Sequence, residues 1–238
     1  TQFASSAASD VYKRQKTVSQ EAGGVITTDM LTGNLSKAAS FLGTANDIVT
    51  VGDFTTGTQA YNDGGFVLVD SNIVTVGGAV VSDGGKISIT APQRVAINAS
   101  GSIDANGGDV DIISDDYAIG GSIDAGTLMF NRYTLGTVHL YATISQGEVN
   151  QLNVENLLIG SNNAAENMVQ NIAVGNIDTT GAVSGLTQLN ANSLVQFGFT
   201  APTTQRFNAV EVNSHWLYAM GANVSTQIGD VTLNVANN

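Results

Sequence analysis

One pentapeptide occurs twice in this chain at a spacing of twenty residues. Gly101–Ala105 and Gly121–Ala125 both read Gly-Ser-Ile-Asp-Ala. Elsewhere a glycine is followed by strict alternation of apolar and polar residues, as at Gly85–Thr90, Gly108–Ile113 and Gly229–Asn234. This alternation is the pattern of a short β-strand buried on one face. A repeat of about 20 to 23 residues is within the range of solenoid repeats, so the chain is limited to architectures built from many short strands.

Further short strands are expected between turns that contain Gly-Gly, Asp-Gly or Asn-Gly. They are expected at Gly65–Asp70, Asn72–Val76, Arg94–Asn98, Thr137–Tyr141, Gln151–Val154 and Asn171–Val174. Thr28–Phe41 and Asn162–Gln170 contain helix-forming residues but no capped apolar stripe of period 3.6. We therefore expect loops or turns in these two segments.

Two all-β architectures produce short strands at this spacing, the antiparallel β-sandwich and the parallel β-helix. The strands recur at the length of one solenoid coil, and only 6% of the residues are aromatic, which suits a narrow interior of medium branched side chains. We therefore predict an all-β parallel β-helix (solenoid), with the antiparallel β-sandwich as the alternative. Asparagines near the expected corners can form ladders of stacked amides. These are Asn98, Asn106, Asn150, Asn153, Asn156, Asn190 and Asn192.

The alternation also predicts the direction of individual side chains. Ile103 and Ile123 hold the same place in the two pentapeptides and should point into one internal column. Asp104 and Asp124 should then point outward, because successive strand residues face opposite ways. By the same reasoning His139 is expected on the solvated side of its strand.

Composition excludes several classes of function. The 238 residues carry a net charge of −12, which argues against nucleic acid as a partner because phosphate binding needs a basic surface. The absence of cysteine excludes disulfides and thiolate metal sites. No apolar run approaches the ~20 residues of a transmembrane helix.

Residues 1–16 differ from the rest of the chain. Three of the eight basic residues lie here, namely Lys13, Arg14 and Lys16. Asp10–Gln15 also resembles the translation of a transposon-end adapter used in sequencing libraries. We therefore expect residues 1–16 to be a non-native or disordered leader of a metagenomic fragment, and residues 17–238 to be one β-helix repeat segment. A natural basic arm for an acidic partner is the alternative.

Several segments resemble the repeats of filamentous-haemagglutinin-like exoproteins. They are, in order, Val25–Gly33, Leu42–Phe54, Gly65–Asp70, Ile73–Val80, Gly101–Ala105 and Gly107–Ile112. The resemblance covers about Val25–Ala125 and is weaker over residues 126–238. It implies a right-handed parallel β-helix that is exported through an outer-membrane pore, as in two-partner secretion or an autotransporter passenger. The family's Asn-Pro secretion motif is missing, because neither Pro92 nor Pro202 follows an asparagine.

The resemblance implies an extracellular location at the bacterial cell surface. We expect a structural and adhesive shaft segment of a secreted protein, without enzymatic activity or a cofactor. Its expected partners are glycans or proteins on host cells, matrix or other bacteria. Two alternatives remain open, a carbohydrate-active β-helix enzyme (polysaccharide hydrolase or lyase) and a self-associating biofilm matrix protein.

The enzyme alternative depends on a dense acidic stretch. It comprises Asp104, Asp109, Asp111, Asp115, Asp116 and Asp124. Polysaccharide hydrolases need two or three converging carboxylates, and Asp115-Asp116 resembles the paired aspartates of pectin-hydrolysing β-helix enzymes. The Gly-His-Gly and Arg-x-Lys partners of those enzymes are absent, and Arg132 is the only nearby base for a lyase. We therefore predict a solvated outer face and no catalytic residue.

Calcium is the other interpretation of these carboxylates. Asp109 and Asp111 should project from one side of a strand, with Asp104 or Asp124 on a neighbouring coil. Such closely spaced oxygens suit a hard cation. The third glycine of the Gly-Gly-x-Gly-x-Asp calcium repeat is missing after Gly107-Gly108. These four aspartates are therefore weak calcium candidates, and no metal site is predicted.

His215 and Trp216 form the remaining candidate pair. Trp216 is the only tryptophan of the chain. Its ring could stack on the apolar face of a sugar, or it could serve as ordinary core or edge cover. The sequence favours the structural interpretation, because a single tryptophan in a β-protein more often covers apolar surface.

Overall fold

The computed structural model describes residues 17–21, 23–57, 65–198 and 203–236, and the leader at residues 1–16 lies outside this part. The described residues form strands with a single short helix, α1 (Gln146–Val149). The strands pair in parallel and stack as a β-solenoid, which confirms the predicted β-helix against the antiparallel sandwich. Contacts divide the chain into two compact units, Thr1–Gly126 and Thr127–Asn238.

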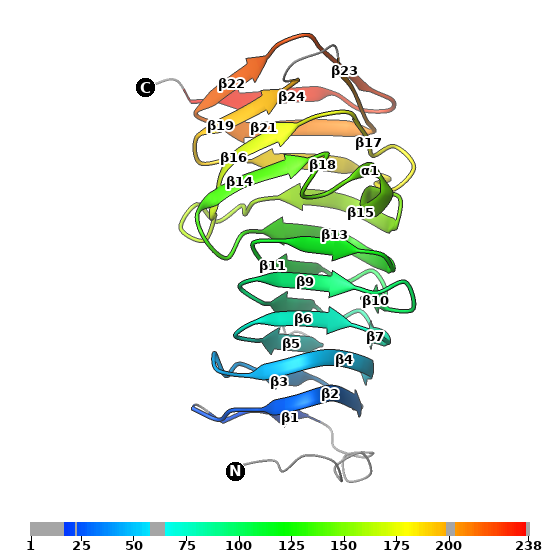
Figure 1. Ribbon diagram of the computed structural model, residues 1–238. Coiled ribbons are helices and arrows are strands. Elements are labelled where there is room, and N and C mark those ends of the chain that lie inside the picture. Colours follow the sequence, from blue (N-terminus) through cyan, green and yellow to red (C-terminus); the bar gives the residue numbers. More distant parts are fainter. Residues whose placement is uncertain (1–16, 22, 58–64, 199–202, 237–238) are drawn as a thin grey trace. The chain divides into compact units, whose positions relative to one another are not determined.

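The first unit is three-sided, because its strands stack in three columns (Figure 1). One column contains β1 (Val18–Ser19), β3 (Ala39–Phe41), β5 (Phe66–Val69), β8 (Ile87–Thr90) and β11 (Val110–Ile113). The second contains β2 (Thr27–Asn34), β4 (Asp47–Thr56), β6 (Ile73–Val76), β9 (Arg94–Ile97) and β12 (Tyr117–Ile119). On the third side the end of β4 is followed by β7 (Ala79–Ser82), β10 (Ser102–Asp104) and β13 (Ser122–Asn131).

The second unit has the same construction. One column contains β15 (Leu152–Ile159), β18 (Leu186–Asn190), β21 (Ala209–Ser214) and β24 (Val231–Val235). The next contains β14 (Gly136–Leu140), β16 (Val169–Val174), β19 (Leu194–Phe197) and β22 (Trp216–Ala219). The third contains β17 (Ile177–Asp178), β20 (Thr203–Phe207) and β23 (Ala222–Thr226). No helix of the described residues has the length and hydropathy that a bilayer-spanning segment requires.

The predicted strand phase is confirmed at the repeated pentapeptide. Ile103 lies opposite Ile123 on the adjacent coil, and both side chains are fully buried. Asp104 lies opposite Asp124, and both are partly exposed. The interior is thus a set of apolar columns that run from coil to coil, since equivalent residues of successive coils stack on one another.

The prediction of loops or turns over Thr28–Phe41 is wrong. This segment contains most of β2 and the whole of β3. β2 pairs along its length with β4, and β3 pairs with β1 and β5. Parallel pairing with neighbouring coils therefore overrides the local helix propensity of these residues. Asn162–Gln170 is not helical, as expected, and β16 begins at its end.

A ladder of asparagines crosses four coils of the second unit. Nδ2 of Asn213 donates to Oδ1 of Asn190, Nδ2 of Asn234 donates to Oδ1 of Asn213, and Nδ2 of Asn190 donates to Oδ1 of Asn162, each at 2.8 Å. Of the predicted ladder residues, Asn190 takes part in this ladder. Asn192, for example, donates instead to the backbone oxygen of Asn167.

A buried carboxyl group lies at one corner of the first unit. Asp70 is almost fully buried after β5, where Oδ2 accepts from the backbone N–H of Ile48 (2.7 Å) and Oδ1 from that of Asn72 (2.8 Å). Burial raises the pKa of Asp70 above its ordinary value of 3.8, although these two hydrogen bonds act in the opposite direction. The carboxyl group of Asp70 therefore links the backbone at Ile48 to the backbone at Asn72, in surroundings that disfavour its ionised form.

Candidate functional site

The strongest candidate site is the outer side of the column β14, β16, β19 and β22, which we call the uncharged face. Its outward side chains form two rows in register, and the rows are Thr137–Asn171–Leu194–Trp216 and His139–Ala173–Gln196–Tyr218. Between them an inward row fills the interior, comprising Val138, Ile172, Val195 and Leu217. The alternation predicted for residues 137–141 is thus confirmed, and His139 lies outside.

Aromatic side chains stand out on this face. The exposed fraction is 59% for Trp216 and 48% for Tyr218. At the other end of the rows, the rings of His139 and Tyr141 meet edge to face with centroids 5.7 Å apart. A Cβ atom on Gly175 would lie 2.8 Å from the ring of Tyr141. Glycine is therefore required at position 175 for Tyr141 to lie against the next coil.

The four strands of this face carry no charged side chain, and the guanidinium group of Arg132 lies at one end of it, where Nη1 donates to the backbone oxygen of Thr137 (3.1 Å). β14, β16, β19 and β22 contain no Asp, Glu, Lys or Arg, in a chain whose net charge is −12. The polar groups of its rows are two side-chain amides, the hydroxyl groups of Thr137 and Tyr218, and the imidazole of His139. Nδ2 of Asn171 donates to Oγ1 of Thr137 (3.3 Å), and Nε2 of Gln196 donates to the backbone oxygen of Gly198 (3.1 Å). Aromatic rings beside neutral hydrogen-bonding groups suit a neutral ligand that is apolar on one side and polar on the other.

His215 lies at the corner before β22, where its side chain contacts the backbone of the preceding coil. Its Nδ1 is 2.6 Å from the backbone oxygen of Asn192 on the preceding coil. This contact fixes the imidazole at the corner, next to the exposed indole of Trp216. The sequence identified the pair but not its surroundings, because the register between β19 and β22 is needed to place Leu194 opposite Trp216 and Gln196 opposite Tyr218.

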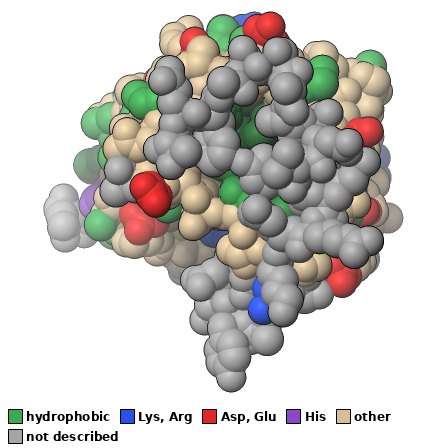
Figure 2. All heavy atoms as spheres, turned by 90° about the horizontal axis from the view of Figure 1, so that it is seen from below, with side chains coloured by type: hydrophobic (Ala, Val, Ile, Leu, Met, Phe, Trp, Pro, Cys, Tyr) green, Lys and Arg blue, Asp and Glu red, His purple; other side chains and the backbone are tan. Residues whose placement is uncertain are grey.

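The acidic stretch of the first unit is interrupted by two ion pairs. Lys86 pairs with Asp111, and Arg94 pairs with Asp116, with Nε of Arg94 2.7 Å from Oδ2. These basic partners were missed in the sequence, although Arg94 and Asp116 are 22 residues apart, the length of one coil. Figure 2 shows carboxylates at separate places on the face that it presents, and not in one patch.

The four calcium candidates are not gathered into one site. Asp104 and Asp124 are in register on β10 and β13, and Oδ1 of Asp104 accepts from the backbone N–H of Asn106 (2.7 Å). Asp111 faces Lys86, and Asp109 is exposed before β11. Within the described ranges, no three carboxylate or imidazole groups lie close enough together to hold a metal ion.

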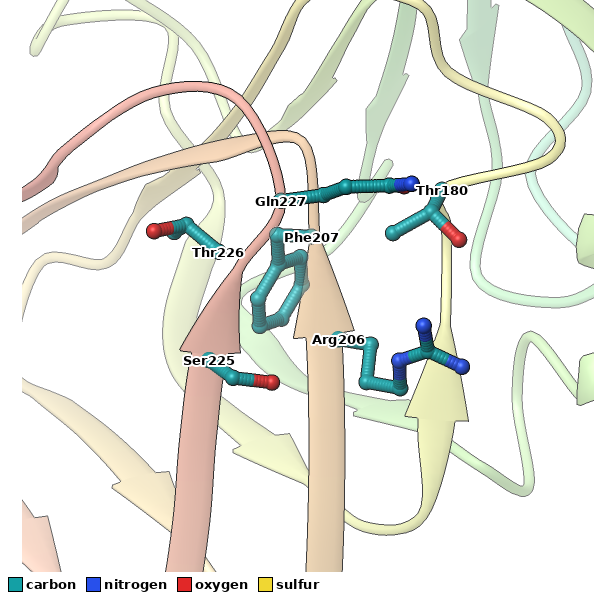
Figure 3. Close-up of a pocket in the computed structure, with 6 residues that line it drawn as sticks. All are labelled: Thr180, Arg206, Phe207, Ser225, Thr226 and Gln227. Atoms are coloured by element: carbon teal, nitrogen blue, oxygen red, sulfur yellow. The ribbon is translucent and has the colours of Figure 1, made fainter.

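A small pocket of about 160 Å³ opens beside β20 and β23 in the second unit (Figure 3). It is lined by Thr180, Arg206, Phe207, Ser225, Thr226 and Gln227. Nη1 of Arg206 is 3.1 Å from Oδ2 of Asp178, whose Oδ1 also accepts from Oγ1 of Thr180 at 2.6 Å. Partial burial raises the pKa of Asp178, but Thr180 and Arg206 outweigh it and the pKa is lowered. The pocket is smaller than the ~300 Å³ at which ligand pockets begin.

No protein-family model matches the chain, and no curated protein or solved structure matches it significantly.

Proposed function

We propose that this chain is a structural and adhesive segment of a secreted bacterial surface protein, of the filamentous-haemagglutinin-like type that its repeats resemble. The proposal includes export through an outer-membrane pore and exposure at the cell surface. The single observation that carries the adhesive part is the uncharged face, because it places Trp216 and Tyr218 on a rigid stack of strands.

The proposed mechanism is non-covalent contact between the outward side chains and a partner surface. Stacked coils pair their backbone groups with one another, so the outward rows are held at fixed spacing. Exposed aromatic groups that are rimmed by polar groups are typical of interaction surfaces. Individually weak contacts gain avidity when several can engage one surface at once. Glycans or proteins on a host cell, matrix or neighbouring bacterium provide such repeated partners.

The arrangement of carboxylates supports adhesion over the hydrolase alternative. A glycoside hydrolase needs one carboxyl group as acid and a second as base or nucleophile. Asp111 and Asp116 are both engaged by basic side chains, Lys86 and Arg94. Both carboxylates are therefore already paired with neighbouring side chains, which does not suit either of these two roles.

A binding assay with matched variants tests the adhesive part. The full chain is applied to immobilised cells, extracellular matrix and a glycan array, and compared with the double variant Trp216→Ala, Tyr218→Ala. We expect binding to weaken about tenfold or more, since aromatic contacts are worth about 0.5–1.5 kcal/mol each beyond their burial. Tyr133→Ala is the control, because Tyr133 is similarly exposed but lies outside the four strands. Equal binding by the double variant and the control would contradict the proposed face.

A further inference from the structure

The corner that follows β10 contains an asparagine next to a glycine. Asn106-Gly107 is the only Asn-Gly pair in the 238 residues. Both residues are exposed and have positive φ, 47° for Asn106 and 81° for Gly107. The backbone N–H of Gly108 donates to the oxygen of Ala105 (2.9 Å), which closes a turn of the type I′ class that Asn-Gly favours. The turn therefore presents the side-chain amide and the peptide bond after it to solvent.

An asparagine that precedes a glycine can lose ammonia without an enzyme. The backbone nitrogen of Gly107 attacks Cγ of Asn106, and the bond between Cγ and Nδ2 breaks. The proton of the attacking nitrogen leaves with Nδ2 as ammonia, and a cyclic imide remains. Water then opens the imide at one of its two carbonyl groups, which gives either an aspartate or an isoaspartate at position 106. Glycine favours the attack because it has no Cβ beside the attacking nitrogen.

The fold leaves the attacking nitrogen available. The N–H of Gly107 makes no hydrogen bond among the described residues, whereas that of Gly108 is engaged in the turn. Ring closure requires the peptide between Asn106 and Gly107 to rotate, so that the nitrogen approaches Cγ. Glycine tolerates both signs of φ. A Cβ added to Gly107 would have no atom within 4 Å apart from those of its chain neighbours, so this peptide has room to rotate.

The amide of Asn106 also joins two coils. Its Nδ2 donates to Oδ1 of Asp83 (3.0 Å), which follows β7 at the equivalent corner of the preceding coil. The backbone N–H of Asn106 donates to Oδ1 of Asp104 (2.7 Å). Loss of the amide replaces the donor to Asp83 with a second carboxylate, and like charges this close repel each other. Isoaspartate in addition lengthens the main chain by one carbon atom, so either product weakens the contact between the two corners.

We propose that Asn106 is a self-modification site, at which spontaneous deamidation loosens the stack of the corners that follow β7 and β10. The reaction needs only water and the chain's own backbone, so it proceeds in the folded protein at a rate set by the turn. It adds one negative charge to a chain whose net charge is −12. This inference does not depend on adhesion, since it rests on a corner of the first unit and not on the uncharged face.

Peptide mapping by mass spectrometry tests the reaction. The folded full chain is kept in mildly alkaline buffer and digested at intervals, and fragment spectra assign each conversion of an amide to an acid to one residue. Asn98 is the internal control, because it is an exposed corner asparagine that is followed by alanine. Conversion should be about tenfold faster at Asn106 than at Asn98, and Gly107→Ala should remove this difference. Equal rates at the two asparagines, or conversion of Asn106 in the unfolded chain alone, would overturn the proposal.

Charge variants test the loosening separately from the reaction. Asn106→Asp should lower the midpoint of thermal unfolding, because it opposes two carboxylates, and added salt should reduce this loss. Asn98→Asp is the matched control, with the same change of charge at another exposed corner. Asp83→Asn combined with Asn106→Asp should recover the lost stability, since it restores an amide–carboxylate pair. Equal midpoints for Asn106→Asp and Asn98→Asp, or no recovery in the double variant, would reject the loosening.

Discussion

Arg94 and Asp116 face each other across adjacent coils of the first unit, with Nε of Arg94 2.7 Å from Oδ2 of Asp116. Asp116 belongs to the stretch that most resembles an acidic active site in the sequence. Asp116 lies on the outer surface, where the charge of its carboxylate is balanced by the guanidinium group of Arg94. The resulting expectation is that the acidic stretch can be altered without loss of function.

Replacement of Asp111, Asp115 and Asp116 by asparagine should leave binding to cells or glycans nearly unchanged. The Arg94–Asp116 pair is solvent-exposed, and in the Lys86–Asp111 pair the lysine is half-exposed. Ion pairs at the surface are typically worth about 0 to 1 kcal/mol. A modest change in salt dependence is the expected effect. Release of reducing sugars from pectin and related polymers is measured alongside. Depolymerisation by the wild-type chain that disappears in the triple variant would establish an enzyme.

Truncation of Ile103 to alanine should destabilise the protein by about 2–5 kcal/mol, because it removes a fully buried side chain and leaves a cavity. Asp104→Ala should cost well under 1 kcal/mol, as expected at a partly exposed outward position. Urea denaturation of the two variants measures the difference. The loosened coil should also become more sensitive to proteolysis near Gly107 and Gly121, since each coil depends on its neighbours. Equal destabilisation by the two variants would be incompatible with the observed strand phase.

Asn213→Ala should destabilise the second unit by about 1–2 kcal/mol, because it removes the amide that links Asn190 to Asn234 and three hydrogen bonds with it, the third to Glu211. Asn223→Ala is the control, since Asn223 is an exposed asparagine on β23 outside the ladder. Thermal unfolding followed by circular dichroism compares the two variants. A larger effect of Asn223→Ala would mean that the ladder contributes little.

The raised pKa of Asp70 predicts a specific pH dependence of stability. The folded state holds this proton more tightly than the unfolded state, in which the pKa is near 3.8. The contribution of Asp70 is therefore fully present below pH 3.8 and is lost as the pH rises through the raised pKa of the folded state. The stability of wild type relative to Asp70→Asn should fall over that interval and then remain constant. A relative stability that increases with pH would show that the folded state favours the carboxylate.

The fold class could be predicted because two periods coincide in the sequence. Alternation gives the strand faces, and the spacing of Gly101–Ala105 from Gly121–Ala125 gives the coil length. The direction of Ile103 and Asp104 follows from these two facts alone. β2 could not be predicted in this way, because its sequence has an outward Met30 and a glycine in place of regular alternation. It forms a strand because β4 pairs with it in parallel.

The uncharged face and the ladder depend on a register that varies along the chain. Thr137 lies opposite Asn171, 34 residues later, whereas Asn171 lies opposite Leu194 after only 23. A fixed period therefore cannot align the rows that end at Trp216 and Tyr218. The Arg94–Asp116 pair, by contrast, follows the regular period of the first unit and could have been found from charge and spacing.

The unequal coil lengths of the second unit have a practical consequence. The long step from β14 to β16 accommodates α1 and additional turns, yet β14 pairs with β16 along most of its length. Extra residues at a corner thus leave the strand register in place. Such a corner is a suitable position for grafting a foreign peptide loop, and a small epitope or affinity tag inserted there would be displayed on a framework that continues to fold around it.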